Sequence, residues 1–410
     1  MIKLDIWTPL PPRKSGIAQY NYELLEELAK FAKVRIVCED VEAEAPSGIE
    51  TIHYGEVKTG TVVTDLFNLY HLGNNLDHEY VYKQALKTPG VVVLHDMTLH
   101  HLIEAFTLGR SDPNSYIETC RNNYGEPGEA LARLRLAGVF HDAQRFKMTL
   151  NRDVCQKAVG VVVHNKYILN RIKSYSRRTY LLEHHVAPAA SRYESVRKAN
   201  LKKSLGLPGD KTPVVASLGF VTAPKMINKA LEALAMVKRA GVAFRYLVVG
   251  EKNPGFDLDH YVGKYGLTDE VIHIDYCTDE DFFKYLAVSD LVINLRYPSA
   301  GESSGTLARA LGMGVPAVVY NFGPFSEFPD DCVFKAPLEL GEPVEMSALL
   351  HLVLSEKSIR EKFGENARKY VSEHCSVRRS VERYISSIVD AYGSYRQAHE
   401  RLRDWVGTKS

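Results

Sequence analysis

"DLVINLRYPSAGESSGTLARALGMGVPAVVYN", residues 290–321, contains an apolar run, a turn of small residues, a helical pattern and a second apolar run. Both apolar runs have the length of a strand, and between them Leu307, Ala310 and Leu311 recur at the spacing of one helix face. A strand, a helix and a second strand in this order join two parallel strands of one sheet. The stretch therefore predicts a parallel α/β fold.

Both halves of the chain repeat this alternation. Strands are expected at 34–39, 66–72, 90–96, 159–165 and 179–186, and then at 213–221, 244–251, 271–277, 290–296 and 315–321. Continuously apolar strands of this kind are typical of parallel sheets that helices cover on both faces. We expect two α/β domains in series, at 1–190 and 212–378, with a polar linker at 191–211 and a helical segment at 379–410.

The composition is that of an ordinary globular protein without a strong overall charge. The 410 residues include 51 Lys and Arg against 50 Asp and Glu, so no global field favours a nucleic-acid partner. Six cysteines without a CxxC pair indicate a reducing compartment and no zinc site. The sequence shows no signal-peptide pattern and no apolar run of membrane-spanning length, so we expect a cytoplasmic protein.

Several common site signatures are missing. The chain has no G-x-G-x-x-G after a strand, no G-x-x-x-x-G-K-[ST] and no G-x-S-x-G. These absences disfavour a dinucleotide-dependent oxidoreductase, a P-loop nucleotidase and a serine hydrolase of the usual kind.

The turn before the helix at 303–312 is the first candidate site. We expect the amides from Ser303 to Thr306 to be free at the helix start, where the helix dipole favours an anion such as phosphate. A serine that only caps the helix is the alternative. The segment follows a strand, however, and ligands of open α/β sheets bind at the carboxyl ends of the strands.

Two other strand ends offer similar features. Gly16 opens the first helix after the first strand, where a glycine allows close approach of a ligand to the backbone. Lys225 precedes the first helix of the second half and can reach a phosphate as a point charge. Anion sites on both domains together indicate a bound diphosphate.

The sequence resembles the family-4 retaining glycosyltransferases of the GT-B fold, over nearly its whole length. The residues that carry the resemblance are "PPRKSGIAQY", "YHLGNNLDHEY", "GVVVLHDMTLHHL", "SLGFVTAPK", "RYPSAGESSGTLARALGMGVP" and "NFGPFSEFPDD". The resemblance implies two Rossmann-like domains that face a cleft. The donor would bind mainly to the second domain and the acceptor to the first, and the C-terminal helix would return to the first domain.

The resemblance also assigns roles to single residues. Glu302 matches an acid that contacts hydroxyls of the donor sugar, Lys225 matches a lysine that neutralises the leaving group, and His95 matches a histidine near the reacting carbon. The implied donor site consists of Gly16, Gly219, Phe220, Lys225, Tyr276, Cys277, Arg296, Glu302, Ser303, Ser304, Gly305 and Thr306. Asn74, His78 and Asp96 are implied on the acceptor side.

The sequence departs from the family pattern at two positions. Arg309 stands where the family has a second acid, which usually holds the ribose, so ribose recognition is unassigned. Phe220 follows Gly219 where an arginine often precedes the lysine, and Arg296 is the candidate for the second positive charge.

The expected activity is transfer of a hexosyl unit from a UDP- or GDP-sugar to a glycan, lipid-linked or small-molecule acceptor, with retention of configuration. Neither a metal nor another cofactor is expected, because the cations and helix amides can stabilise the departing diphosphate. A nucleotide-sugar 2-epimerase of the same fold and a non-catalytic sugar-binding subunit are the alternatives. Peripheral contact with the inner face of a membrane is the alternative to a wholly cytoplasmic location.

Overall fold

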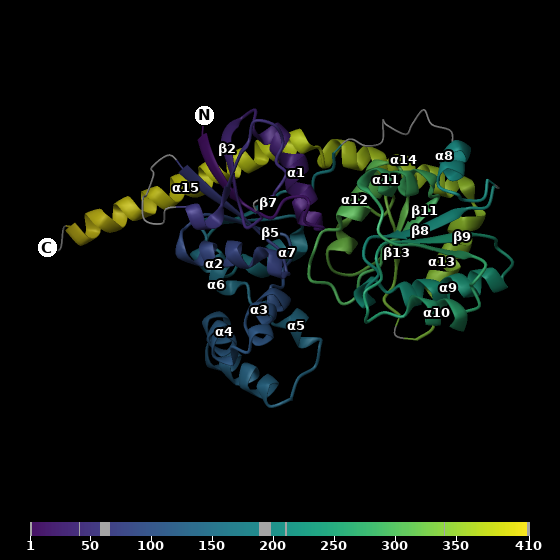
Figure 1. Cartoon of the computed structure of the whole chain (residues 1–410), viewed down its shortest axis with the longest axis horizontal. Helices are drawn as coiled ribbons and strands as arrows, with labels where there is room; N and C mark the ends of the chain where they lie inside the picture. Colours follow the sequence, from purple (N-terminus) through teal and green to yellow (C-terminus); the bar gives the residue numbers. More distant parts are fainter. Residues whose placement is uncertain are drawn as a thin grey trace. The chain divides into compact units, whose positions relative to one another are not determined.

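The computed structural model describes residues 2–40, 42–57, 66–187, 198–209, 211–339 and 341–407. The chain divides into two compact units (Figure 1). Unit 1 comprises Met1–His185, Ala300–Ser303 and Val377–Ser410, and unit 2 comprises Val186–Ser299 and Ser304–Ser376. Unit 1 includes a short segment, 300–303, that the sequence had placed in the second domain.

A seven-stranded sheet forms the centre of unit 1, with the strand order β3-β2-β1-β4-β5-β6-β7. Its strands are β1 Ile2–Trp7, β2 Ala32–Cys38, β3 Glu50–His53, β4 Leu66–Leu72, β5 Val91–Leu94, β6 Gly160–Val163 and β7 Thr179–Leu181. Every neighbouring pair is parallel. Parallel pairing brings the carboxyl ends of all these strands to one edge of the sheet. The sequence had not predicted β3, whose residues are half-exposed and carry little apolar signal.

Helices cover both faces of this sheet (Figure 1). They are α1 Gly16–Leu28, α2 Glu79–Lys87, α6 Arg152–Lys157, α7 Lys166–Ile172 and α15 Val377–Gly407. Helices α3 His100–Phe106, α4 Pro113–Leu136 and α5 Gln144–Lys147 lie beyond α2 and α6, away from the sheet (Figure 1). Alternate strand residues face opposite sides: Val91 and Val93 pack with α1 and α15, whereas Val92 packs with α2, α6 and α7. The C-terminal helix α15 is thus part of unit 1, as the sequence predicted, and the hydroxyls of Tyr20 on α1 and Tyr384 on α15 lie 2.8 Å apart.

Unit 2 contains a second parallel sheet, of six strands, in the order β10-β9-β8-β11-β12-β13. The strands are β8 Val214–Leu218, β9 Arg245–Val249, β10 Val271–Ile274, β11 Leu291–Ile293, β12 Ala317–Tyr320 and β13 Phe334–Ala336. All pairs are again parallel. The sequence stretch quoted first supplies β11, α12 and β12, so the predicted strand–helix–strand unit is confirmed.

The helices of unit 2 are α8 Lys198–Ser204, α9 Ile227–Arg239, α10 Leu258–Lys264, α11 Asp279–Val288, α12 Gly305–Gly312, α13 Val344–Ser355 and α14 Lys357–His374. One side of the sheet carries α9, α10 and α13, and the other carries α8, α11, α12 and α14 (Figure 1). Helix α8 lies inside the segment predicted as a linker, because Leu201 contributes an apolar contact to the core of unit 2. The two-domain α/β prediction is confirmed.

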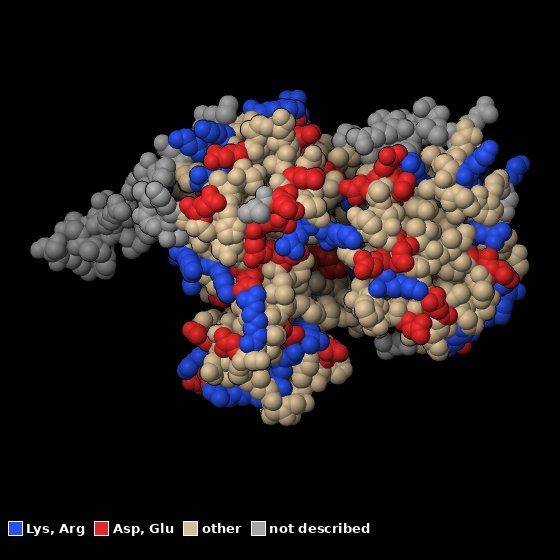
Figure 2. Space-filling model, viewed as in Figure 1, with Lys and Arg blue, Asp and Glu red and all other residues tan. Residues whose placement is uncertain are grey.

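The visible surface shows acidic and basic side chains interspersed, without a broad field of one sign (Figure 2). Such mixing agrees with the near-zero net charge. In the described part of the chain, no helix combines the length and the apolar character needed to span a bilayer.

Candidate functional site

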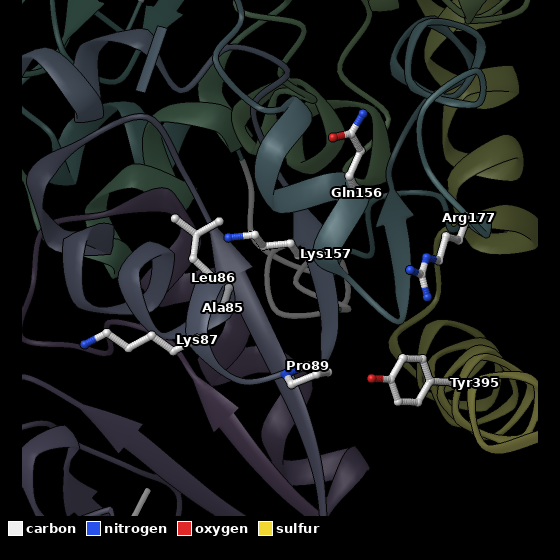
Figure 3. Close-up of a pocket in the computed structure, with 8 residues that line it drawn as sticks. All are labelled: Ala85, Leu86, Lys87, Pro89, Gln156, Lys157, Arg177 and Tyr395. Atoms are coloured by element: carbon white, nitrogen blue, oxygen red, sulfur yellow. The ribbon is translucent and has the colours of Figure 1, made fainter. Parts of the chain in front are cut away.

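Two surface pockets lie at the amino-terminal edges of the sheets. One has a volume of about 380 Å³ and is lined by Ala85, Leu86, Lys87, Pro89, Gln156, Lys157, Arg177 and Tyr395 (Figure 3). The other, of about 320 Å³, lies in unit 2 around Thr212, Val242 and Arg245. Neither contains a predicted site residue. Ligands of parallel α/β sheets bind at the opposite, carboxyl-terminal edges, and the candidate site lies at those edges.

Lys225 lies at the carboxyl edge of unit 2, in a short 3-10 helix, η5 (Ala223–Lys225), that follows β8. Its Nζ atom donates a hydrogen bond to the carbonyl of Leu218 at 2.8 Å. Burial lowers the pKa of the Lys225 ammonium well below its usual value, and the nearby Arg296 lowers it further. Within the described ranges, no carboxylate forms an ion pair with Lys225. An anion bound here would supply the missing negative charge.

Three other predicted residues gather beside Lys225. Gly219 has φ +88°, and a Cβ atom there would lie 2.7 Å from Lys225 Nζ and 3.8 Å from Thr306 Oγ1. Arg296 follows β11 and donates from Nη1 to its neighbour's carbonyl, that of Leu295, at 3.0 Å. Gly219, Lys225, Arg296 and Thr306 therefore form one cluster, in which the missing side chain of Gly219 lets Lys225 Nζ lie close to the backbone.

Helix α12 contributes its amino terminus to the same edge of unit 2. Ser304 is the N-cap, and its Oγ atom accepts from the Leu307 amide at 3.2 Å and donates to Asn294 Oδ1 at 3.1 Å. The capping alternative is thus correct for Ser304, and the helix starts at Gly305, not at Ser303. Within the described residues the amides of Gly305 and Thr306 have no hydrogen-bond partner, so they can still bind an anion.

The remaining predicted donor residues of unit 2 lie in exposed turns. Phe220 is 47% exposed beside Gly219, and Tyr276 is 56% exposed after β10. Cys277 is half-buried in the same turn, directly before the N-cap of α11. Their position after strands of one sheet allows contact with a ligand, and the exposed rings of Phe220 and Tyr276 offer surfaces for stacking.

Glu302 and Ser303 belong to unit 1, through the segment 300–303. The Ala300 carbonyl accepts from the amides of Met97 and Thr98 at 2.7 and 3.2 Å. Asn165 Nδ2 donates to the Gly301 carbonyl at 3.0 Å and to Ser303 Oγ at 3.1 Å. The residues on both sides of Glu302 therefore make hydrogen bonds within unit 1, which the sequence did not predict.

Asp96 and Glu302 form a pair of interacting carboxyls in unit 1. Burial, and to a smaller extent the negative charge of Glu302, raise the pKa of Asp96 to about 7. The backbone amide of Asn74 donates to Asp96 Oδ2 at 2.8 Å, and this hydrogen bond lowers the Asp96 pKa. Asp96 can consequently donate or accept a proton near neutral pH.

His95 follows β5 and keeps 7% of its surface exposed. Its Nε2 atom lies 2.9 Å from Nδ1 of the fully buried His71, which is on β4. The ring also contacts the Tyr20 ring edge-on, at a centroid distance of 4.9 Å. Burial is the main cause that lowers the pKa values of both His95 and His71, and neighbouring imidazoles lower them further. His95 is thus a neutral imidazole at neutral pH.

Two predicted acceptor-side residues have structural partners. Asn74 Oδ1 accepts from the amides of His101 and Leu102, and Asn74 Nδ2 lies 2.8 Å from His101 Nδ1, so this side chain holds the start of α3. His78 is fully buried, and its Nδ1 atom lies 2.8 Å from the His71 carbonyl. Asn74 is half-buried, whereas His78 is sealed from solvent.

Gly16 is the first residue of α1, and Ser15 caps that helix by accepting from the Ile17 amide at 3.2 Å. No atom lies within 4 Å of the place where a Cβ of residue 16 would be. The space beside Gly16 is open at the carboxyl edge of unit 1, as the sequence prediction requires.

Sequence reasoning missed His71, Asn165 and Asn294, which position other site residues. Asn165 carries a detectable signal, because it precedes a helix and caps α7 through the Ile168 amide at 2.9 Å. Its contact with Gly301 joins residues 136 positions apart and has no local signal. Within the ranges that the structure describes, no three His, Cys, Asp or Glu side chains are arranged to hold a metal ion.

The family model and the two relatives that match parts of this chain all represent glycosyltransferases. Residues 198–370 match the glycosyl transferases group 1. An alpha-D-kanosaminyltransferase from Streptomyces kanamyceticus is 25% identical over 172 residues, which are 42% of this chain and 43% of that protein. A 2-deoxystreptamine glucosyltransferase from the same organism is 29% identical over 124 residues, 30% of this chain and 31% of its own. Each alignment thus spans less than half of the relative's length.

Solved structures extend the likeness in fold to almost the whole chain. A sucrose-phosphate synthase from Thermosynechococcus elongatus superposes with a TM-score of 0.66 at 14% identity, covering 98% of this chain and 100% of that one. HepE from Anabaena, in complex with UDP and glucose, superposes with a TM-score of 0.62 at 13% identity, covering 95% and 100%. The two Rossmann-like units are those of the GT-B fold, and residues 198–370 are similar to the group 1 glycosyltransferases.

Proposed function

We propose that this protein is a retaining glycosyltransferase that uses a nucleotide diphosphate sugar as its donor. The observation that carries the proposal is the half-buried Lys225, close to Arg296, at the carboxyl edge of unit 2 and without a carboxylate partner in the described part of the chain. The family of residues 198–370 supports the same reaction class.

The diphosphate of the donor is assigned to unit 2. Burial and Arg296 disfavour the charged form of Lys225, and a diphosphate would favour that form by bringing two or more negative charges. Lys225 and Arg296 provide the positive charge, while the amides of Gly305 and Thr306 provide donors at the positive end of the α12 dipole. The absence of a side chain at Gly219 lets Lys225 Nζ and Thr306 Oγ1 lie close to its backbone, next to these donors.

Sugar hydroxyls are assigned to unit 1. Glu302 can accept hydrogen bonds from a pair of hydroxyls, and Asp96, with a pKa of about 7, can donate or accept one. His95 offers one imidazole nitrogen that is not sealed from solvent. These are the groups that we expect to contact the transferred sugar and the acceptor.

The reaction breaks the bond between the anomeric carbon and the diphosphate oxygen, and a bond to the acceptor oxygen forms on the same face of the sugar. Negative charge grows on the departing diphosphate, where Lys225, Arg296 and the α12 amides stabilise it. Preorganised donors of this kind each contribute about a hundredfold or more to the rate. The departing phosphate oxygen takes the acceptor's proton, so no enzymic base is required for the transfer.

The test is a transfer assay with UDP- and GDP-hexoses and small hydroxylated acceptors, including aminocyclitols. NMR of the product gives the anomeric configuration. We expect nucleoside diphosphate release that depends on the acceptor, and a product with the configuration of the donor. Lys225→Met should lower the rate about a hundredfold or more, whereas Lys229→Met, which removes a lysine that pairs with Glu232, should not.

The alternatives give different results in the same assay. Nucleotide release without an acceptor, together with a free 2-epimeric sugar, would indicate the epimerase. An inverted product would contradict retention, and the absence of release from every donor would leave a sugar-binding subunit as the better account.

A further inference from the structure

We propose that His71 is a positioning residue that fixes the tautomer of His95, so that the open nitrogen of His95, Nδ1, carries the proton and donates a hydrogen bond to the bound sugar. The inference rests on the proposed function for the identity of the ligand. The tautomer itself follows from contacts within unit 1 and does not depend on that function.

The two nitrogens of His71 have different surroundings. Nδ1 lies 2.9 Å from His95 Nε2, and one of these atoms must donate to the other. Nε2 of His71 is buried and has no hydrogen-bond partner among the described residues. If His95 donated, His71 would have to carry its own proton on Nε2, where an N–H group would be buried without an acceptor.

Burying an N–H group without a partner is much rarer in proteins than leaving an acceptor lone pair unused. The lower-energy arrangement therefore places the His71 proton on Nδ1, donates it to His95 Nε2, and leaves the lone pair of His71 Nε2 unused. His95, which is neutral because it is buried among other imidazoles, then carries its single proton on Nδ1.

Two neighbouring imidazoles, those of His78 and His164, also have a donating Nδ1 atom and a buried Nε2 atom, and in both the acceptor is known. His78 Nδ1 lies 2.8 Å from the His71 carbonyl, and His164 Nδ1 lies 2.9 Å from the Leu182 carbonyl. A carbonyl can only accept, so both Nδ1 atoms donate. Their Nε2 atoms are, like that of His71, buried and without a partner among the described residues. A lone pair on a buried Nε2 atom is thus a repeated feature of this cluster.

His95 Nδ1 differs from these buried atoms. It has no hydrogen-bond partner in the described part of the chain, and it is not sealed from solvent. With its proton fixed on Nδ1, His95 acts as a neutral donor toward an acceptor oxygen of the ligand, such as a sugar hydroxyl. It cannot act as a general base through that nitrogen.

The direct test is long-range proton–nitrogen NMR of the whole protein with labelled histidine side chains, without any substrate. We expect His95 to show a protonated Nδ1 and a bare Nε2. A proton on His95 Nε2 would overturn the inference. Because no substrate is needed, this result is independent of whether the proposed transfer reaction is found.

Variants then test the role of His71. His71→Leu removes the donor, and we expect His95 to shift toward the Nε2-protonated form and the kcat/KM of transfer to fall roughly tenfold, the effect of one lost hydrogen bond. His71→Asn, whose amide nitrogen can replace Nδ1 as a donor, should restore both the spectrum and most of the kcat/KM. His164→Leu is the matched control, because it removes an equally buried imidazole that contacts the His95 ring without a hydrogen bond to it; the His95 tautomer should stay unchanged.

Two results would contradict the role of His71. One is an unchanged His95 spectrum in the His71→Leu protein. The other is an equal loss of kcat/KM in the His71→Asn and His71→Leu proteins. If His71→Leu fails to fold, the wild-type and His71→Asn spectra still decide the question.

Discussion

At the scale of single residues, two glycines near the candidate site should respond differently to alanine. Gly16 has ordinary helical geometry and open space beside it, so Gly16→Ala should fold and be as stable as wild type or slightly more, by up to about 1 kcal/mol. Gly301 has φ +81°, and a Cβ there would lie 2.6 Å from Met97 Cβ, so Gly301→Ala should be destabilised. Thermal unfolding compares the two. A Gly16→Ala protein that unfolds as early as Gly301→Ala would contradict the described geometry.

Lys225 should take up a proton when a diphosphate binds. Burial and Arg296 lower the pKa of its ammonium well below the usual value, and a bound anion would raise it again. Calorimetry with UDP at pH 8, where the phosphates are already fully ionised, in buffers of different ionisation enthalpy measures the protons exchanged. We expect net uptake in the wild-type protein and none in Lys225→Met. A binding enthalpy that is independent of the buffer would show that Lys225 stays charged in the free protein.

At the scale of elements, helix α12 allows its two roles, a capped helix and an anion site, to be separated. Ser304→Ala removes the cap and should lower the free energy of unfolding by about 1 kcal/mol. Ser304→Asp keeps a good cap and suits the helix dipole, so it should retain stability, but its charge would repel a diphosphate. Denaturant unfolding and nucleotide titration of both variants check this. Normal nucleotide affinity in Ser304→Asp would place the diphosphate elsewhere.

The elements themselves could largely be predicted from the sequence. Strands β5, β8 and β12 are largely apolar because both faces are covered, and that pattern is local. Strand β3 was missed because its edge position leaves its side chains half-exposed. Helix α8 was missed because its sequence, "KANLKKS", contains one apolar anchor among lysines.

The candidate site could be predicted only in part, because only some of its residues have a local sequence signal. Lys225, Glu302 and His95 follow strand ends and have local signals. The attachment of residues 300–303 to unit 1 depends on Asn165 and on the amides of Met97 and Thr98, which are remote in sequence. The burial of His78 and the use of Asn74 to hold α3 are likewise properties of packing, which one sequence does not reveal.

At the scale of the whole molecule, stability should fall as the pH falls below 6.5. Burial lowers the pKa values of His78 and His164 to about 4, and also lowers those of His71 and His95. These groups bind protons in the unfolded chain at a higher pH than in the folded protein, so their contribution to stability is present above pH 6.5 and is lost as the pH falls toward 4.

Asp96 opposes this trend. Its pKa, raised to about 7, gives a contribution that is full below its unfolded value of 3.8 and is lost as the pH rises through 7. Four histidines outweigh one aspartate, so the free energy of unfolding should be lower at pH 5 than at pH 7. Denaturant titrations at both values measure it, and Asp96→Asn should steepen the dependence while His164→Asn should flatten it. Higher stability at pH 5 would show that the buried imidazoles are not neutral.

The central claim, that unit 2 binds the diphosphate of a nucleotide-sugar donor through Lys225, is tested most directly by calorimetric titration with UDP, GDP and ADP, with and without Mg²⁺. We predict binding of one nucleotide irrespective of the metal, about ten- to a hundredfold weaker in Lys225→Met, as for the loss of a charged hydrogen bond, and unchanged in Lys229→Met. Absence of binding by all three nucleotides, or equal binding by Lys225→Met, would contradict the account.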